Sequence, residues 1–277
     1  MRFGVQVSIA RGPAKAVEFA VERGCEAVQL FSSNPRGWAL PRRAASDDVE
    51  IRRRFADAGI HPIVLHTPYL INIAARDPTI YARSVASLVH AADRGRRLDA
   101  FVVVHAGRSQ TGARDEILSR AAAALLTAVK LVPGAQILVE PTAGGRGSVG
   151  STVSELAELL DAVSDDRVGV CLDTCHAHAC GHDLSTHAKA KRWLREVDAH
   201  IGFDRVRVVH VNDSRDPPGA CRDRHFGLGD GTIGSEGLRA VLSDRRVRAL
   251  TGILETPGKA ADDRRNLARA RSYASAT

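Results

Sequence analysis

Eight short apolar runs recur along the chain, each about one strand and one helix apart, and they constrain its fold more than any other feature. They cover residues 3–8, 27–31, 62–66, 101–105, 137–140, 169–173, 206–212 and 252–255. Each run is continuously hydrophobic rather than alternating, which is typical of parallel strands buried on both faces. Amphipathic segments lie between the runs, and the one at 151–163 opens with Ser151 and Thr152 as candidate helix caps. This pattern predicts an α/β fold, a closed (β/α)8 TIM barrel.

The length of 277 residues would accommodate two small domains or one barrel, but no Pro-, Gly- or Ser-rich linker divides the sequence. We therefore expect residues 1–277 to form a single TIM-barrel catalytic domain. The first residues lack the apolar core of a signal peptide, and no segment approaches the roughly 20 apolar residues of a membrane span. We expect a cytoplasmic protein with no membrane partner.

The cysteines and the net charge indicate the compartment and the kind of partner to expect. The five cysteines are odd in number, and three of them lie within residues 171–180, which is unlike a disulfide framework and favours a reducing compartment. The formal net charge of +7 favours an anionic partner such as nucleic acid or a phosphate ester. Most of the basic residues are Arg, which compositional drift alone can produce, so charge does not decide the partner by itself.

Polar residues with metal-binding side chains end six consecutive apolar runs. They are His66, His105, Glu140, Asp173, His210 and Glu255, of which His210 lies just inside the end of its run. The C-terminal ends of all strands of a TIM barrel meet at one face, so these side chains would surround one pocket. A single polar residue after an apolar run usually just leaves the core and bonds to backbone. Six in register on successive strands favour a metal site.

Three further residues extend this set. His176 follows Asp173 by three residues, and Asp223 and His225 lie two apart, so that in an extended loop they project to the same side. Imidazoles and carboxylates without obligatory thiolates suit zinc best, and manganese or iron next. A catalytic zinc takes about three protein ligands, so the number of candidates indicates three ions.

The charge of such a centre favours a phosphate substrate. Three divalent cations outweigh four carboxylates and a hydroxide, so the pocket would be positive and would attract an anion. Clustered metal ions hydrolyse phosphodiesters by lowering the pKa of a water molecule and by neutralising the attacking and leaving oxygens. The residues therefore point to phosphodiester hydrolysis.

Three other interpretations of the chain remain open. The segment GRGSVG (145–150) has the spacing of a dinucleotide-binding loop, but that interpretation leaves all the candidate ligands unexplained, so we expect no nucleotide cofactor. A metal-dependent sugar isomerase or epimerase barrel would also use Glu140, Asp173, His210 and Glu255. It would have little use for a basic surface or for a further site made of His176, Asp223 and His225. A non-catalytic binder of damaged DNA would have no need of a complete ligand set.

Other residues of the His- and Cys-rich segments are expected to have structural roles. Cys171, Cys175 and Cys180 match no common zinc spacing, and Cys171, inside an apolar run, is expected to fill the core. His178 and His182 are expected in a loop or behind the ligands. The stretch 212–234 is long for an irregular connection, which hints at function.

Seven stretches spread over the whole chain carry a family resemblance. They are HTPYLINIA (66–74), VVVHAG (102–107), VEPTAGGRGSVG (139–150), GVCLDTCHAHACGHDL (169–184), HVNDS (210–214), DRHFGLGDGTIG (223–234) and ETP (255–257). In order and spacing the sequence resembles the endonuclease IV family of apurinic/apyrimidinic (AP) DNA endonucleases. The resemblance implies a three-zinc site that cleaves DNA 5′ to an abasic site, leaving a 3′-hydroxyl and a 5′-deoxyribose phosphate, with removal of 3′-blocking groups left open.

The resemblance also implies how the ligands divide. His66 and His105 would hold one zinc and share Glu140 with a second. Asp173, His210 and Glu255 would complete that second site, and His176, Asp223 and His225 would hold the third. Glu140 and Glu255 would be the catalytic carboxylates, and manganese or iron could replace zinc at one site. The partner would be double-stranded DNA with abasic sites, bound by a monomer at the nucleoid.

For recognition of the lesion, the resemblance points to NPRGW (34–38) and PYL (68–70). Arg36, Tyr69 and Leu70 would enter the minor groove and fill the stack from which the abasic nucleotide is extruded, because flipping costs least where a base is missing. Without the resemblance, Tyr69 would be a ring packed on the barrel rim and Arg36 a solvated charge. One departure from the family is Pro141, which replaces the Asn that often follows the bridging Glu. The replacement puts in doubt any supporting hydrogen bond from that side chain, but not the ligand Glu140 itself.

Overall fold

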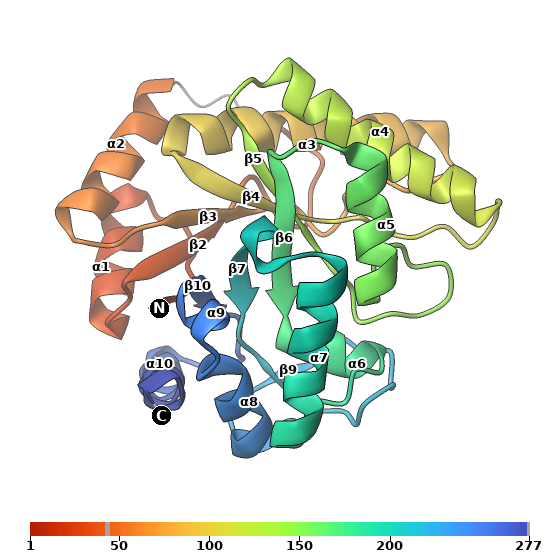
Figure 1. The fold of residues 1–277 in the computed structure, drawn as a ribbon. Helices are drawn as coiled ribbons and strands as arrows, with labels where there is room; N and C mark the ends of the chain where they lie inside the picture. Colours follow the sequence, from red (N-terminus) through yellow and green to blue (C-terminus); the bar gives the residue numbers. More distant parts are fainter. Residues whose placement is uncertain (42–44, 276–277) are drawn as a thin grey trace.

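A closed barrel of parallel strands forms the centre of the protein, in a computed structural model that describes residues 1–41 and 45–275 (Figure 1). Its strands are β1 (Arg2–Gln6), β2 (Ala27–Phe31), β3 (Ile63–His66), β4 (Ala100–His105), β5 (Gln136–Glu140), β6 (Val168–Asp173), β7 (Val206–His210) and β10 (Thr251–Leu254). Each strand pairs with its neighbours in chain order, and β10 closes the barrel against β1. The predicted TIM barrel is confirmed.

Helices cover the outside of the barrel, one or more after each strand (Figure 1). They are α1 (Pro13–Arg23), α2 (Ala45–Asp57), α3 (Pro78–Leu98), α4 (Arg114–Leu131), α5 (Val153–Val163), α6 (Thr174–Cys180), α7 (His187–His200), α8 (Gly234–Leu242), α9 (Arg245–Arg248) and α10 (Ala260–Ser275), with a 3-10 turn at Phe203–Arg205. Of the two predicted caps for α5, Thr152 is the N-cap, and it forms a reciprocal capping box with Glu155. In the described part of the chain, no helix combines the length and apolar character needed to cross a membrane.

Two layers of apolar side chains hold the barrel together. The inner layer lies within the barrel and consists of Ala27, Val64, Val103, Leu138, Cys171, Val208 and Ile253. The outer layer fills the space between strands and helices, with side chains such as Leu30 and Leu125 fully buried. Cys171 is fully buried, as expected of a core residue, and burial raises the pKa of its thiol to about 12. Apolar side chains therefore fill the middle of the barrel below the cluster of polar residues at its C-terminal face.

The strand ends differ by a residue or two from the predicted runs. β1 ends at Gln6 rather than at residue 8, and β7 ends at His210 rather than at residue 212. Glu255 lies just beyond β10 instead of ending it. His66, His105, Glu140 and Asp173 end their strands as predicted. The runs continue past the strands because residues such as Val7 and Val211 remain buried after strand pairing stops.

The segment 212–234 is more ordered than its sequence suggests. A short antiparallel pair, β8 (Asp213–Ser214) and β9 (His225–Phe226), lies within it. The buried carboxylate of Asp213 accepts hydrogen bonds from the backbone N–H groups of Ser214, Gly229, Gly231 and Ile233, at 2.8 to 3.1 Å. A Cβ at Gly231 would lie 2.5 Å from Asp213 Oδ1, so only glycine fits there. This anchor holds the segment that carries Asp223 and His225.

Candidate metal centre

The structure brings all nine predicted ligands together at the C-terminal end of the barrel. Donor atoms lie within 4.8 Å of one another in three groups that match the predicted division. These groups are His66, His105 and Glu140; Glu140, Asp173, His210 and Glu255; and His176, Asp223 and His225. A fourth group, Asp173 with Cys175 and His225, adds a cysteine that sequence reasoning had set aside. Eight strands converging on one face account for this concentration.

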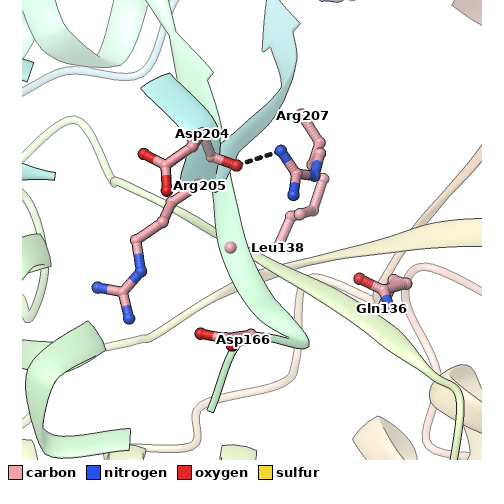
Figure 2. Close-up of a pocket in the computed structure, with 7 residues that line it drawn as sticks. Gln136, Leu138, Asp166, Asp204, Arg205 and Arg207 are labelled. Atoms are coloured by element: carbon pink, nitrogen blue, oxygen red, sulfur yellow. Dashed lines mark hydrogen bonds between the residues drawn. The ribbon is translucent and has the colours of Figure 1, made fainter. Parts of the chain in front are cut away.

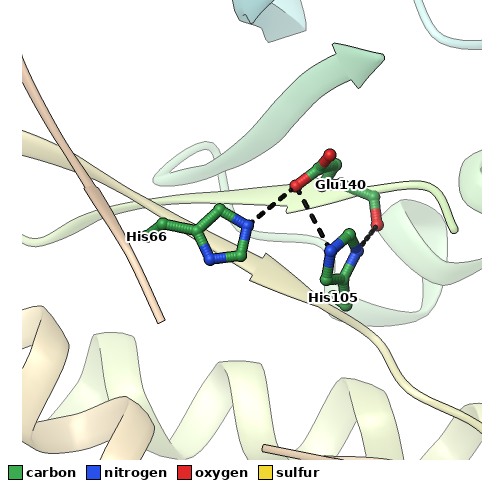
Figure 3. Close-up of side chains that lie close together, drawn as sticks. All are labelled: His66, His105 and Glu140. Carbon is green, nitrogen blue, oxygen red and sulfur yellow. Dashed lines mark hydrogen bonds and ion pairs between the residues drawn. The ribbon is translucent and has the colours of Figure 1, made fainter. Parts of the chain in front are cut away.

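The first group lies at the ends of β3, β4 and β5 (Figure 3). One carboxylate oxygen of Glu140, Oε2, lies 3.1 Å from His66 Nε2 and 3.5 Å from His105 Nε2. His105 and Glu140 are also partners in the strand register, so neighbouring strands set their spacing. Glu140 is fully buried, whereas His105 is partly exposed towards the pocket.

The second group is the most buried and shares Glu140 with the first. The other carboxylate oxygen, Glu140 Oε1, lies 2.9 Å from His210 Nδ1. Glu255 Oε2 is 3.3 Å and Asp173 Oδ2 is 3.8 Å from the same nitrogen. Glu140 therefore lies between the first two groups, with one oxygen facing each, and its Oε1 also lies 3.1 Å from His176 Nδ1.

The third group depends on a helix that the sequence did not reveal. Residues 174–180 form α6 rather than a loop, because Asp173 caps the helix by accepting a hydrogen bond from the His176 N–H at 2.7 Å. The first turn of α6 then directs His176 at the loop that carries Asp223 and His225. Asp223 Oδ1 lies 3.2 Å from Nε2 of both imidazoles.

Backbone carbonyls and one amide fix which nitrogen of each ring carries a proton. A carbonyl oxygen only accepts, so a ring nitrogen facing it must be an N–H. His66, His105, His176 and His225 direct Nδ1 at the carbonyls of Thr67, Glu140, Pro141 and Glu255, respectively, at 2.7 to 3.3 Å. His210 instead directs Nε2 at the side-chain oxygen of Gln29, at 2.8 Å. Pro141 thus orients His176 through its backbone carbonyl, although its side chain cannot form a hydrogen bond.

The opposite nitrogen of every ring faces a carboxylate. In a neutral imidazole that nitrogen carries a lone pair, so at these contacts two acceptors face each other. His176 Nε2 and His225 Nε2 are buried and have no hydrogen-bond partner among the described residues. Protonating all five rings would place like charges side by side, with ring centroids of neighbouring pairs 5.3 to 6.0 Å apart. Cations between the nitrogens and carboxylates resolve the conflict, so the residues fit a metal centre.

The carboxylates are held in their charged form. Burial alone would raise the pKa of Glu140, but positive charge on His210 and His105, when these rings are protonated, outweighs it and holds the pKa well below its ordinary range. Desolvation is likewise outweighed at two other carboxylates. His176 lowers the pKa of Asp223, whose side chain is still 60% exposed, and His210 lowers the pKa of Glu255. Anionic oxygens are therefore available for divalent cations.

Sequence reasoning missed two amides that hold these ligands. Gln29, fully buried in β2, contacts both His210 and Glu255. Asn212, also fully buried, donates to Asp173 Oδ2 at 2.8 Å and accepts from the Glu255 N–H at 2.9 Å. The signal for Gln29 was present, since a polar residue interrupts the apolar run AVQLF at 27–31.

A pocket of about 640 Å³ opens over the metal centre and reaches the rim. Among its lining residues are His66, His105, Glu255 and Tyr69. Tyr69 is 67% exposed, although its ring makes an edge contact with Phe31 at 5.3 Å between centroids. Arg36 is exposed on the neighbouring loop. The two loops are joined by a hydrogen bond of 3.1 Å from the Tyr69 N–H to the Pro35 carbonyl. Leu70 is 37% exposed. The three predicted DNA-contacting side chains thus lie on adjacent loops beside the pocket.

The other histidines of the His- and Cys-rich segment have structural contacts. His178 is buried in α6 and accepts a hydrogen bond from the Leu184 N–H at 3.1 Å, while its Nε2 lies 3.2 Å from Thr232 Oγ1. His182 lies 3.4 Å from Glu196. Both stand behind the ligands, as expected, but His178 belongs to a helix and not to a loop.

A second pocket, of about 320 Å³, lies at the opposite end of the barrel (Figure 2). Its residues, including Gln136, Asp204 and Arg207, sit at the beginnings of β5 and β7. Arg207 donates a hydrogen bond to the carbonyl of Asp204, as the dashed line in Figure 2 shows. None of the metal-ligand groups found in the described residues includes a residue of this pocket. Among the described residues, the candidate metal-ligand groups therefore all lie at the C-terminal face.

Comparison with known proteins gives a consistent result. Residues 17–274 match the family described as xylose isomerase-like TIM barrel. The chain is 38% identical over 279 residues to the probable endonuclease 4 of Cenarchaeum symbiosum (strain A), an alignment that covers 99% of this chain and 100% of that protein. Endonuclease IV from Thermus thermophilus is similar in structure, with a TM-score of 0.87 and 36% identity over 99% of this chain and 98% of that one. A D-tagatose 3-epimerase-like protein has a TM-score of 0.75 at 20% identity over 99% and 97% of the chains, a likeness of fold alone.

Proposed function

The chain belongs to the endonuclease IV family within the xylose isomerase-like TIM barrels, and from this premise we propose that it incises DNA at abasic sites. The reaction is hydrolysis of the phosphodiester 5′ to the lesion, which leaves a 3′-hydroxyl and a 5′-deoxyribose phosphate. Removal of 3′-blocking groups would use the same chemistry. The observation that carries the proposal is the ring of five imidazoles and four carboxylates in which lone pairs face anionic oxygens at the base of an open pocket.

Three zinc ions are proposed for this centre. Imidazole and carboxylate donors suit zinc, with manganese or iron as the alternative at one site. His66, His105 and Glu140 would hold the first ion, and Glu140, Asp173, His210 and Glu255 the second. His176, Asp223 and His225 would hold the third. When bound, the metals would activate a water molecule and neutralise charge on the phosphate oxygens.

The protein's own groups would set the geometry of the reaction. Glu140, with one oxygen towards each of two groups, would fix the separation between the first and second ions. Glu255 lines the pocket and lies against His210, so it would orient the attacking water as well as bind metal. On the rim, Arg36, Tyr69 and Leu70 would hold the distorted duplex and select the flipped-out abasic nucleotide.

All nine candidate ligands come from one chain, so the site needs no second copy, and we propose that the protein acts as a monomer on double-stranded DNA. The sugar epimerase alternative has in its favour the likeness of fold and the group Glu140, Asp173, His210 and Glu255, which such an enzyme would also use. His176, Asp223 and His225 form a third group that such an enzyme would not require. A non-catalytic damage binder would likewise have no use for a complete set of ligands.

The test is to incubate the metal-loaded protein with a duplex that bears one synthetic abasic analogue. We expect a single cut 5′ to the analogue and no cut in the matched intact duplex. Glu140→Gln is the matched control, because it keeps the size of the side chain and removes the charge shared by two groups. Bound but uncut DNA would favour the damage binder, and epimerisation of a ketose without DNA cleavage would favour the sugar enzyme.

A further inference from the structure

A buried amide on β2 contacts two candidate ligands at once. Gln29 is fully buried, and its side chain lies between Gln6 on β1 and the pair His210 and Glu255. Gln6 and Gln29 are partners in the register of β1 and β2, so the barrel itself sets them side by side. A buried amide costs free energy unless its polar atoms are paired, and here both ends of Gln29 have partners.

The partners determine which way the Gln29 amide points. One of its two terminal atoms lies 2.7 Å from Glu255 Oε1 and 2.9 Å from Gln6 Oε1. Both of these oxygens accept, so the atom between them must be the NH2 group, which has two hydrogens to give. The opposite orientation would set an oxygen against a carboxylate. The carbonyl oxygen of Gln29 therefore faces His210 Nε2, at 2.8 Å.

This orientation makes His210 differ from the other four imidazoles. The Gln29 oxygen requires an N–H at His210 Nε2, which leaves the lone pair on Nδ1. His66, His105, His176 and His225 have the reverse arrangement, with Nδ1–H on a backbone carbonyl. His210 is thus the one imidazole of the five whose tautomer is fixed by a side chain, and its Nδ1 faces both Glu140 and Glu255.

We propose that Gln29 is a positioning residue for the second group of ligands, held in orientation by Gln6. It fixes the Nδ1-ligating tautomer of His210, and it holds one oxygen of Glu255 so that the other, Oε2, stays directed at the same ion. The first and third groups make no hydrogen bond to Gln29. The proposal rests on the metal centre of the proposed function and assigns this residue's effect to one ion of three.

The alternative is that Gln29 only fills space with its polar atoms satisfied. In that case its replacement would lower stability without singling out one metal. Partners behind metal ligands, when removed, cost roughly 10- to 100-fold in metal affinity. A selective loss at one ion therefore separates positioning from filling.

The experiment compares Gln29→Leu with the parent protein by competition against a chromophoric zinc chelator. We expect Gln29→Leu to release one zinc with roughly 10- to 100-fold weaker affinity and to retain the other two as the parent does. Tyr273→Phe is the matched control, since it removes one hydrogen bond of a buried side chain, to Ser235 at 2.8 Å, away from the centre. Its three affinities should equal those of the parent.

A second measurement needs no variant that might unfold. In the zinc-loaded parent, ¹⁵N NMR of the imidazoles should show one metal-bound Nδ1 with a protonated Nε2, at His210, and four metal-bound Nε2 atoms. Equal zinc affinities in Gln29→Leu and parent, uniform weakening of all three ions, or an Nε2-bound His210 would each overturn the inference. If the parent binds no zinc, the proposed metal centre itself fails.

Discussion

Two clusters of charged side chains in this protein differ in what faces their buried carboxylates. Between α2 and α3, the fully buried carboxylate of Asp48 accepts from Arg94 Nε and Arg97 Nε, each at 2.9 Å, and Arg94 also donates to the Ser32 carbonyl at 2.8 Å. In that cluster donors meet acceptors. At the C-terminal face, by contrast, the carboxylates of Glu140 and Asp223 meet imidazole nitrogens that carry lone pairs.

The contrast teaches how to separate a structural cluster from a functional one. Burial and charge are shared by both, so neither distinguishes them. What differs is whether hydrogen bonds within the protein can satisfy the groups. In the Asp48 cluster each carboxylate oxygen accepts from a guanidinium N–H, whereas the second cluster leaves room for cations between its members and opens into a pocket.

The largest effect on activity is expected from Glu255→Gln, which removes one carboxylate from the candidate metal centre. We expect cleavage of abasic DNA to fall by roughly 10³-fold, because an amide binds metal poorly and orients water poorly. Duplex affinity, measured by fluorescence anisotropy, should stay within about 3-fold, since the phosphate contacts lie elsewhere. Turnover equal to that of the parent would remove Glu255 from the ligands.

Asp48→Ala instead removes the carboxylate of the cluster between α2 and α3. It leaves the buried Arg94 without its carboxylate, so we expect a loss of about 3 to 5 kcal/mol in the free energy of unfolding by urea. Metal content and cleavage per folded molecule should not change. Asp93→Asn, a change at the half-exposed partner of Arg97, is the control and should cost less than about 1 kcal/mol. Loss of metal in Asp48→Ala would refute the separation of the two clusters.

Tyr69→Ala leaves both clusters intact and alters the rim alone. We expect the preference for abasic over intact duplex to fall by roughly 10-fold, because stacking of an aromatic ring contributes about 1 to 3 kcal/mol. Metal content should equal that of the parent. Binding assays on the two duplexes measure this ratio. An unchanged ratio would make Tyr69 a ring packed on Phe31 and nothing more.

The smallest effect is expected at a third charge cluster, where Asp244 caps α9 and pairs with Lys191 and Arg246, each at 3.0 Å. Burial opposes ionisation, but these cations hold the pKa of Asp244 at about 2. Because the pKa of this carboxyl is lower in the folded protein than in the unfolded chain, where it is near 4, its ionisation stabilises the folded state above pH 4. This contribution to stability is lost as the pH falls towards 2. Asp244→Asn should therefore cost about 1 to 2 kcal/mol at pH 7 and progressively less below pH 4, by urea unfolding. A difference independent of pH would contradict this.

The sequence predicted the barrel and the gathering of nine candidate ligands at one end of it, because both depend largely on periodic signals. Strand runs at regular intervals specify the closed sheet, and polar residues at the ends of six consecutive runs mark the C-terminal face. His176, Asp223 and His225 followed from short-range spacing within the same segments.

What the sequence did not predict depends on contacts between distant segments. α6 forms because Asp173 caps it, and the order of 212–234 comes from the buried carboxylate of Asp213. Neither is visible as a periodic pattern. Gln29 was visible as a polar interruption, but its meaning required knowing that its side chain meets His210, at the end of β7, and Glu255, just after β10, although β2 pairs with neither strand.

Elemental analysis of protein purified without added metal tests the central claim most directly. If imidazole lone pairs facing carboxylates mean resident cations, the protein should carry three ions per chain, predominantly zinc. Glu140→Gln should carry fewer, since two groups share that carboxylate. A fully folded parent that contains no metal, and takes none up from excess zinc, would contradict the account.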